Sequence, residues 1–371
     1  MHDHGQKELP DREGRSHRPG RERACLAGES QRGEAGRDVP AARQRHAARL
    51  LRRYYATGVL EEAATRGMPA NLTTRLQGGR AGPALTRRQV GADGTTKLLL
   101  RLADGRTVES VLMPDFRADR AAGCVSSQVG CAMGCDFCAT TKSGFERNLT
   151  AGEMVEQFLA LRREAHAAGR RLQTIVFMGM GEPMLNLEAV LAAVRRLGDN
   201  DLGGLGWRQI TVSTVGIVPG IDALADSGLG VHLAVSLHAP DDATRAQLLP
   251  MGRRFPIADI LAAADRFQSR RGRPVTIQYC LLAGVNDTVG HAENLAELLA
   301  GRRMHVNLLR YNPTGLSLRG IEYHPSSDAT AGRFAAVLHD RGVVAHFRRS
   351  RGPEIDAACG QLRRRSTGAV D

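Results

Sequence analysis

Long apolar runs are absent from this chain of 371 residues, and none approaches the roughly 20 residues that a membrane-spanning helix needs. The first residues, MHDHGQKELP, also lack the apolar core of a secretory signal. These absences argue against a membrane protein and an exported protein, so we expect a cytoplasmic enzyme or binding protein. The length suits one large domain with appendages, or two domains.

Lysine is nearly absent as well. Only Lys7, Lys97 and Lys142 are lysines among the 51 basic residues, and the formal net charge is +12. Arginine forms bidentate contacts with phosphate better than lysine does, and a surplus of positive charge attracts polyanions. The composition favours a nucleic-acid partner, although a basic composition alone is a weak signal.

Neither an export signal nor an even number of cysteines is present, which argues against a structural disulfide framework. Four of the seven cysteines fall between Cys124 and Cys138. In a reducing compartment such clustering indicates metal or redox chemistry. We therefore expect the function to reside in this segment.

Composition divides the chain into four predicted regions: a disordered basic tail (1–45), an accessory region (46–118), a main domain (119–362) and a basic C-terminal tail (363–371). The accessory region is expected to hold one or two short helices between Ala47 and Ala81. A β-hairpin should follow, because Thr96–Leu102 and Thr107–Leu112 flank Asp104-Gly105.

After Gly123, short apolar runs alternate with helical segments, as in repeated βα units around a parallel sheet. The six predicted strands are Cys124–Val129, Thr174–Met178, Gln209–Ser213, Gly230–Ser236, Thr276–Leu281 and His305–Leu309. The predicted helix N-caps are Thr150, in a capping box with Glu153, and Asn186, Asp241 and Ser326. Six units in about 190 residues predict an α/β fold of the partial (β/α)6 TIM-type barrel kind, because a full barrel needs about 250 residues.

Polar motifs follow five of these strands, at the ends where barrel enzymes place their chemistry. They are the cysteine loop, Gly181-Glu182-Pro183, Ser213-Thr214, Ser236-Leu237-His238 and Asn312-Pro313. We expect these five strand ends to meet at one mouth.

The spacing Cys131-x3-Cys135-x2-Cys138 places three thiolates on one tight loop. Three protein ligands on a four-iron cluster leave one iron open, and an open iron can chelate a small molecule and pass it an electron. The alternative is a structural zinc site with Cys124 as the fourth ligand. Zinc sites usually join two cysteine pairs that lie far apart in sequence, so the cluster is favoured.

From about Glu109 to Leu362 the chain resembles the radical S-adenosylmethionine enzymes, and within them the adenine-specific RNA methyltransferases of the RlmN/Cfr type. The resemblance depends on long strings: CVSSQVGCAMGCDFCATTKSGFERNLT, VFMGMGEPMLNLE, TVSTVGIVPGI, AVSLHAP, VNDT, NLLRYNP and AACGQL. It implies a radical S-adenosylmethionine partial barrel with a catalytic C-terminal segment.

The resemblance also assigns residues. It implies that Cys131, Cys135 and Cys138 bind one [4Fe-4S] cluster. The residues that it implies for S-adenosylmethionine are Gly181, Glu182, Ser213, Ser236, Leu237, His238 and Asn312. Read singly, each of these would be a strand-end turn or a satisfied polar cap, and only together do they indicate a site.

Three further residues match family positions with chemical roles. Cys359 matches the cysteine that carries a methyl group, and Cys124 matches the cysteine that resolves a covalent protein–RNA intermediate through a transient Cys124–Cys359 disulfide. Glu109 matches the glutamate that accepts the ring proton; its alternative reading is an exposed strand carboxylate. The implied ping-pong route uses two S-adenosylmethionine molecules per turnover, one as methyl donor and one as radical source.

The expected reaction is methylation of an adenine carbon, carbon 2 rather than carbon 8, in 23S rRNA and in tRNA. An electron donor such as flavodoxin or ferredoxin and a monomeric state are expected with it. The alternatives are a radical enzyme of the same build that acts on another RNA base or a non-RNA substrate, and a non-catalytic metal-bearing RNA-binding protein. The Cys124 and Cys359 pair argues against the last, since binding alone needs neither thiol.

The RNA contact is less localised. The arginines expected to track phosphates are Arg101, Arg106, Arg117, Arg120, Arg147, Arg310, Arg348, Arg349, Arg351 and Arg363–Arg365. Cys25 and Cys280 receive no role and should be dispensable. The amino-terminal region differs from the family's usual RNA-binding unit, and Thr140-Thr141 and Arg310-Tyr311 depart from the usual pattern.

Overall fold

The computed structural model describes residues 41–58 and 83–362. By backbone packing the chain divides after Gln44, and the description concerns the unit from Arg45 to Asp371. The predicted tails therefore lie outside the described residues, except for residues 41–45, and so does Cys25. Among the described residues, no helix is both long and apolar enough to cross a bilayer.

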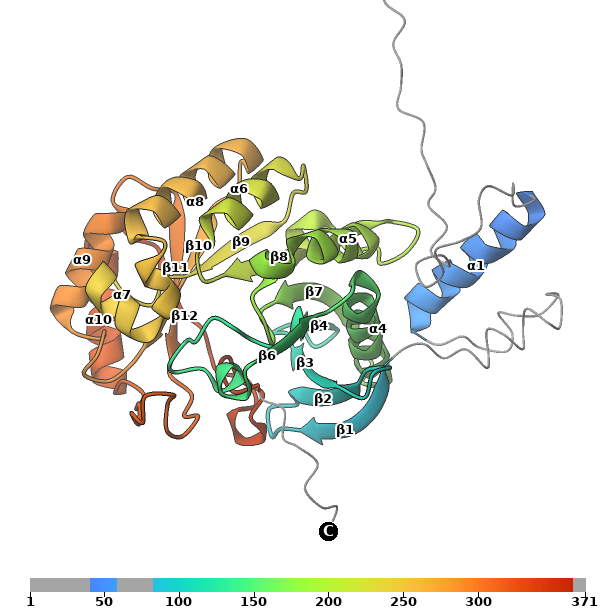
Figure 1. Cartoon of the computed structure of the whole chain (residues 1–371), viewed down its shortest axis with the longest axis horizontal. Helices are drawn as coiled ribbons and strands as arrows, with labels where there is room; N and C mark the ends of the chain where they lie inside the picture. Colours follow the sequence, from blue (N-terminus) through green and yellow to red (C-terminus); the bar gives the residue numbers. More distant parts are fainter. Residues whose placement is uncertain (1–40, 59–82, 363–371) are drawn as a thin grey trace, which may run out of the picture. The chain divides into compact units, whose positions relative to one another are not determined.

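A single ten-stranded sheet organises the described chain (Figure 1). Its order is β1 (Ala84–Val90), β2 (Thr96–Arg101), β3 (Thr107–Pro114), β4 (Arg120–Cys124), β7 (Arg171–Phe177), β8 (Ile210–Thr214), β9 (His232–Ser236), β10 (Val275–Leu281), β11 (Met304–Arg310) and β12 (Ala345–Phe347). Pairing is antiparallel from β1 to β4 and parallel from β4 to β12. The mostly parallel α/β sheet confirms the predicted fold class.

Helices connect the parallel strands and cover the sheet (Figure 1). They are α4 (Ala151–Ala167), α5 (Leu187–Gly198), α6 (Val218–Asp226), α7 (Asp242–Leu248), α8 (Ile257–Arg271), α9 (Val289–Leu299) and α10 (Asp328–Asp340), preceded along the chain by α1 (Ala41–Thr57). The apolar residues of these helices pack on the sheet in one hydrophobic core. This core fixes the strand ends, and therefore the site.

Three of the four predicted helix N-caps are confirmed in position, and two of them cap through their side chains. The Thr150 hydroxyl accepts the Glu153 amide at 3.2 Å in a capping box, and the Asp241 carboxylate accepts the Thr244 amide at 2.7 Å. Asn186 is the third, but it makes no side-chain cap bond to α5, because its amide group donates to the carbonyls of Ser127 and Leu149. Ser326 was wrong: Ser327 caps α10, and the Ser326 hydroxyl donates to Asp287 instead.

The first predicted strand, Cys124–Val129, was also wrong. The strand β4 ends at Cys124, and the short β5 (Gln128–Gly130) pairs with β6 (Phe145–Asn148) in a separate two-stranded sheet. Contacts with distant segments break the strand here, because the Ser126 amide donates to the Gln157 side chain and the Ser127 amide donates to the carbonyl of Met180. The other five strands are confirmed within three residues at either end, whereas β1, β6 and the three-residue β12 were not predicted.

The predicted hairpin is confirmed as β2 and β3. The amide of Leu102 donates to the carbonyl of Arg106 at 2.7 Å, and Gly105 takes the left-handed φ of +82° that the turn requires. The hairpin is hydrogen-bonded to β4, so its strands extend the barrel sheet. Its residues consequently border the strand ends where the candidate site lies.

Candidate active site

Three cysteines occupy the loop between β5 and the 3₁₀ turn Ala139–Ser143. Cys131 and Cys135 are buried, Cys138 is half-buried, and none is in a disulfide. Burial raises the pKa of all three thiols, to about 12 for Cys131, and the charge of Cys138 adds to the shift of Cys131 and Cys135. A buried thiol of this kind stays protonated near neutral pH unless a cation beside it stabilises the thiolate.

The donors around these sulfurs suit an iron–sulfur cluster. The backbone amides of Met133 and Gly181 donate to Cys131, and those of Thr140 and Thr141 donate to Cys138. Hydrogen bonds of this kind to cluster sulfurs tune the reduction potential of iron–sulfur centres. The residues therefore fit a cluster bound by Cys131, Cys135 and Cys138, and that assignment stays a prediction.

The zinc alternative required Cys124 as a fourth ligand. Cys124 interacts instead with Cys359 and Arg348, and burial first and Cys359 second raise its pKa to about 12. Among the described residues, no group of three Cys, His, Asp or Glu side chains is arranged around a single metal ion. A multi-iron cluster spans a wider ligand set than one ion, so the geometry at Cys124 favours the cluster over zinc.

Gly181 and Glu182 form the turn after β7. Gly181 has a φ of +100°, and a Cβ there would lie 2.5 Å from the Cβ of Gln128, so only glycine fits. The Glu182 carboxylate is buried, and it accepts the backbone amides of Met184 at 3.0 Å and Val215 at 2.9 Å. It thus joins the ends of β7 and β8, and burial raises its pKa to about 7.

The next two predicted motifs lie at neighbouring strand ends. The Ser213 hydroxyl donates to the carbonyl of Phe177 at 2.9 Å, which joins β8 to β7, and Ser236 ends β9. The buried Leu237 amide donates to the carbonyl of Gln278 at 3.1 Å. Strand pairing therefore brings these residues to the same edge as the turn after β7, as predicted.

His238 has an unusual backbone, with a φ of +59°. Its Nδ1 accepts the Cys280 amide at 2.9 Å, and its ring packs edge-on against Phe137 in the cysteine loop. Burial, followed by the charge of Arg245, lowers its pKa to about 3. The imidazole is therefore neutral, and it connects the end of β9 to the cysteine loop.

The Cys359 segment is held against the cysteine loop and the end of β11. The Asn312 amide group donates to the carbonyl of Cys359 at 3.4 Å, and the Thr140 hydroxyl donates to the carbonyl of Leu362 at 2.6 Å. The Gln361 side chain donates to the carbonyl of Pro313 at 3.3 Å. The C-terminal segment thus closes over the site that the strand ends form.

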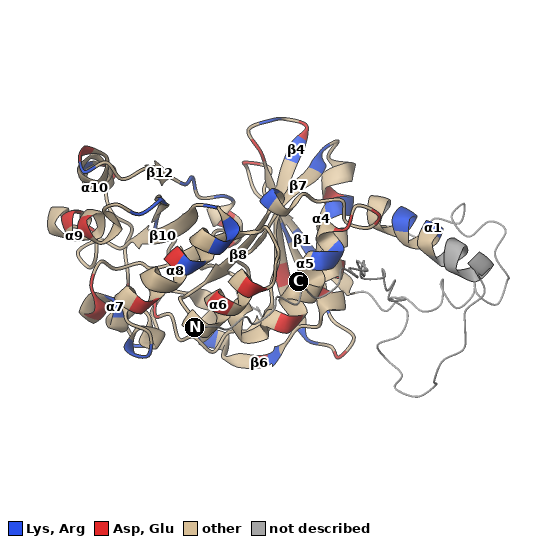
Figure 2. Ribbon diagram, turned by 90° about the horizontal axis from the view of Figure 1, so that it is seen from above, with Lys and Arg blue, Asp and Glu red and all other residues tan. Residues whose placement is uncertain are grey.

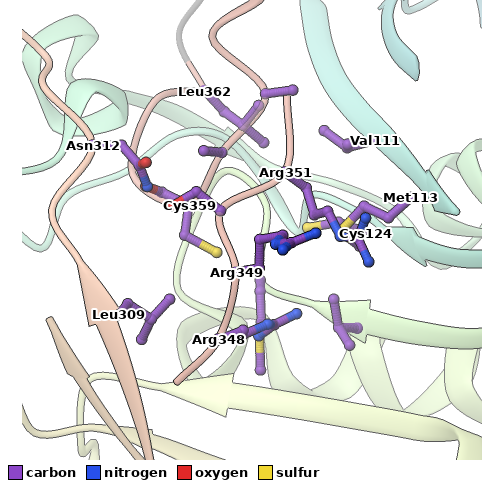
Figure 3. A pocket seen from close by; sticks show the side chains of 15 residues that line it. Val111, Met113, Cys124, Leu309, Asn312, Arg348, Arg349, Arg351, Cys359 and Leu362 are labelled. Carbon is purple, nitrogen blue, oxygen red and sulfur yellow. The ribbon is translucent and has the colours of Figure 1, made fainter. Parts of the chain in front are cut away.

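One open pocket brings Cys124 and Cys359 together although 235 positions separate them in the sequence. Figure 3 shows the Cys359 sulfur pointing into it, with the Arg348 and Arg349 guanidinium groups beside it. The strand residues Val111, Cys124 and Val176 line its sheet side. The cavity volume is only about 40 Å³, and the pocket opens to solvent.

Glu109 lies on β3, two residues before the pocket-lining Val111. Its side chain is 5% exposed, which rules out the alternative reading as an exposed carboxylate, and its Oε1 is 3.2 Å from Nζ of Lys97. Its backbone carbonyl accepts the Ser126 hydroxyl at 2.7 Å. Lys97 was missed in the sequence; its signal was that so few lysines occur in an arginine-rich chain.

The predicted RNA-contacting arginines differ in their surroundings. Arg348, Arg349 and Arg351 line the pocket, and Arg351 also lies 4.0 Å from Asp93. Others are engaged in ion pairs: Arg106 with Asp104 and Glu146, Arg147 with Asp104 and Glu153, Arg310 with Asp328, and Arg120 with Asp119. Arg101 and Arg117 are exposed, and Arg363–Arg365 lie outside the described residues. Figure 2 shows basic residues on many elements, interleaved with acidic ones.

Comparisons with known proteins agree with this arrangement. The family model described as the radical SAM superfamily matches residues 125–299. The probable dual-specificity RNA methyltransferase RlmN 1 of Opitutus terrae is 74% identical over 321 residues, which cover 86% of this chain and 90% of the relative. The probable dual-specificity RNA methyltransferase RlmN of Rhodopirellula baltica is 49% identical over 272 residues, 73% of this chain and 71% of the relative.

A solved structure agrees as well. The crystal structure of a radical SAM methyltransferase from Sphaerobacter thermophilus matches with a TM-score of 0.81 and 45% identity, and the match covers 86% of this chain and 93% of that one. The resemblance inferred from the motifs is thereby confirmed. This chain belongs to the RlmN family of radical SAM RNA methyltransferases.

Proposed function

We propose that the protein methylates an adenine carbon of RNA, with Cys359 as the methyl carrier and Cys124 as the resolving thiol. One observation carries this proposal: two free cysteines that are distant in sequence line one pocket, beside arginines and the cysteine loop. Adenine carbons 2 and 8 are electron-poor, so a simple polar transfer has no nucleophile to use. A thiol that first accepts the methyl group and then presents it to the adenine ring removes the need for a nucleophilic ring carbon.

The radical SAM family implies one [4Fe-4S] cluster and S-adenosylmethionine, which supply a methyl group and one-electron chemistry. Cys131, Cys135 and Cys138 would hold the cluster. The residues proposed to hold S-adenosylmethionine are Gly181, Glu182, Ser213, Ser236, Leu237, His238 and Asn312. We propose two S-adenosylmethionine molecules per turnover, because the carrier thiol must be methylated separately from the radical step.

The chain's own groups then have defined tasks. The Cys359 thiolate accepts and presents the methyl carbon, and Glu109 accepts the proton that leaves the adenine ring. The Cys124 thiolate attacks the Cys359 sulfur, and a Cys124–Cys359 disulfide forms as the bond between that sulfur and the methylene carbon breaks. The electron pair of that bond passes to the methylene carbon, which takes up a proton and becomes the methyl group, and a thiol reductant then returns the disulfide to two thiols. Arg348, Arg349 and Arg351 face the phosphates of the RNA strand.

For the substrate we propose 23S rRNA and tRNA, with carbon 2 modified in preference to carbon 8. The curated relatives are named dual-specificity RNA methyltransferases, which supports more than one RNA target. A flavodoxin or ferredoxin as electron donor, a monomeric state, and a cytoplasmic location beside the ribosome complete the proposal. Residues 46–118 are proposed as the accessory region and 119–362 as the catalytic region, between tails 1–45 and 363–371.

Nucleoside mass spectrometry tests the function. The anaerobically reconstituted protein is incubated with S-adenosylmethionine, a reductant and unmodified rRNA or tRNA. New 2-methyladenosine is the expected product, and 8-methyladenosine would move the assignment to the other ring carbon. Deoxyadenosine without methylated adenine would favour the alternative, a radical enzyme of the same build that acts on another base or on a substrate other than RNA.

A further inference from the structure

The Lys97 ammonium lies where the β2–β3 hairpin meets the Cys359 segment. Its Nζ is 3.2 Å from Oε1 of Glu109 and donates to the carbonyl oxygen of Asp356 at 3.3 Å. The Lys97 and Glu109 side chains are only 6% and 5% exposed. A buried ammonium is stable only when such partners replace its water, so these contacts hold Lys97 in one position.

Strand pairing explains why Lys97 reaches this place. Lys97 on β2 is paired with Val111 on β3, and Val111 is paired with Cys124 on β4. Directly paired residues project from the same face of a sheet, and Val111 and Cys124 line the pocket. Glu109 precedes Val111 by two residues, so it shares that face and lies diagonally across from Lys97. The Lys97 ammonium therefore lies at the end of the row of side chains, Cys124 and Val111, on the sheet side of the pocket.

The turn between β1 and β2 holds the same C-terminal segment from another side. The Ala92 amide donates to Oε1 of Glu354 at 2.8 Å, and the Gly352 amide donates to Oδ2 of Asp93 at 3.3 Å. A Cβ on Gly91 would lie 2.3 Å from Oε1 of Glu354, so glycine makes room for that carboxylate. The turn between β1 and β2 thus holds the segment that leads to Cys359 through these hydrogen bonds.

Composition supplies an independent reason to assign Lys97 a specific task. The chain uses arginine at all but three of its 51 basic positions. A guanidinium is planar and forked, whereas an ammonium is a compact charge that can donate in several directions at once. A buried lysine in such a chain marks a position where the compact charge is required.

We propose that Lys97 is the positioning residue that holds the Glu109 carboxylate and the Cys359 segment in register on one face of the pocket. The inference depends on the proposed function, in which Glu109 takes the ring proton while the adenine is joined to Cys359. Lys97 acts through these two partners. Its ammonium, 3.2 Å from Oε1, orients the Glu109 side chain, and its bond to Asp356 fixes the residues just before Cys359.

Two substitutions at this position test the proposal against a matched control. Lys97→Met removes the charge at similar length, Lys97→Arg keeps the charge but changes its shape, and Arg88→Met breaks the exposed pair with Glu164 at the neighbouring β1. The readouts are the extent of Cys359 S-methylation by peptide mass spectrometry, and the rate of methyladenosine formation. The rate is compared between RNA with protium and RNA with deuterium on the adenine ring carbons.

Lys97→Met is expected to retain Cys359 methylation and to slow methyladenosine formation by about ten- to a hundredfold, with a larger deuterium isotope effect than in the wild type. Covalent protein–RNA adduct should build up, because removal of the ring proton becomes the slow step. Lys97→Arg should lie between Lys97→Met and the wild type in rate and isotope effect, and Arg88→Met should match the wild type.

A wild-type rate and isotope effect in Lys97→Met would overturn the proposal. So would equal loss of Cys359 methylation and product in both Lys97 variants with an unchanged isotope effect, since that pattern reports a general structural role. If Lys97→Met does not fold, the isotope effect of Lys97→Arg decides in the same way. Failure of the wild-type protein to form any methyladenosine would instead count against the proposed function.

Discussion

The backbone amide of Ala139 donates a hydrogen bond of 2.7 Å to the carbonyl oxygen of Gly360. The residue after the third cysteine of the loop is thereby joined to the residue after Cys359. This bond places the methyl-carrying candidate beside the proposed cluster although the two lie at opposite ends of the main domain. Cys359 interacts electrostatically with both Cys124 and Cys138, as expected for a thiol between the two.

The resolving thiol is tested by Cys124→Ala. Without this thiol, the adenine joined to Cys359 has no attacking sulfur to release it, so a covalent protein–RNA adduct should accumulate while product falls by at least about a hundredfold. The adduct is measured as an RNase-sensitive band of low mobility in a denaturing gel.

Cys280→Ala is the matched control for this substitution. Cys280 is half-buried and also interacts with Cys359 and Cys138, yet the account gives it no task. It should form product at the wild-type rate without adduct. Adduct in Cys280→Ala but not in Cys124→Ala would reverse the assignment of the resolving thiol.

The turn after β7 predicts a steric requirement at Gly181. Gly181→Ala places a Cβ 2.5 Å from that of Gln128 at a φ of +100°, so the free energy of unfolding should fall by about 1–3 kcal/mol. Thermal unfolding should show this loss together with weaker S-adenosylmethionine binding. Gly169→Ala, at a φ of +67° with no atom within 4 Å, controls for backbone strain alone. Equal melting temperatures for the two variants would contradict the close approach.

His238 predicts a pH dependence of stability. Its pKa is about 3 in the folded protein against the ordinary histidine value of 6.5, because burial disfavours the charged ring. The unfolded chain therefore binds a proton as pH falls below 6.5 and the folded chain does not. Its contribution to stability is complete above pH 6.5 and declines by about 1.4 kcal/mol per pH unit down to pH 3.

Urea unfolding at pH 7.5 and 5.5 checks this dependence. Asparagine tolerates the left-handed backbone at this position. Between pH 7.5 and 5.5, the free energy of unfolding of His238→Asn should therefore fall by about 1.4 kcal/mol less than that of the wild type. An identical pH dependence in the two proteins would show that folding does not lower the pKa of His238.

The pocket arginines predict the salt dependence of RNA binding. Arg349 is exposed and lines the pocket. By contrast, Arg266 of α8 forms an ion pair of 2.7 Å with Asp222 of α6. Arg349→Gln should weaken RNA binding several-fold and lower the slope of log affinity against log salt by about one, and Arg266→Gln should change neither. Fluorescence anisotropy over a salt series makes the comparison. Equal slopes for Arg349→Gln and the wild type would show that Arg349 does not contact an RNA phosphate.

Periodicity and motifs predicted the parallel sheet and the strand ends because those patterns are local. The break after Cys124 was not predictable in the same way, since it depends on Gln157 of α4, whose side chain accepts the Ser126 amide. Similarly, nothing local to Glu109 indicates that it is buried beside Lys97. The three-residue β12 is too short to carry a periodic signal. Contacts between distant segments decided each of these features.

Transfer of a labelled methyl group through Cys359 tests the central claim most directly. The protein is first loaded with S-adenosylmethionine that carries a deuterated methyl group, freed of excess reagent, and then given unlabelled S-adenosylmethionine, reductant and RNA for one turnover. Deuterated methyl is expected on the Cys359 peptide before the chase, and deuterium is expected in the methyladenosine of the first turnover. Methyladenosine that carries only unlabelled methyl, with the label still on Cys359, would contradict this claim.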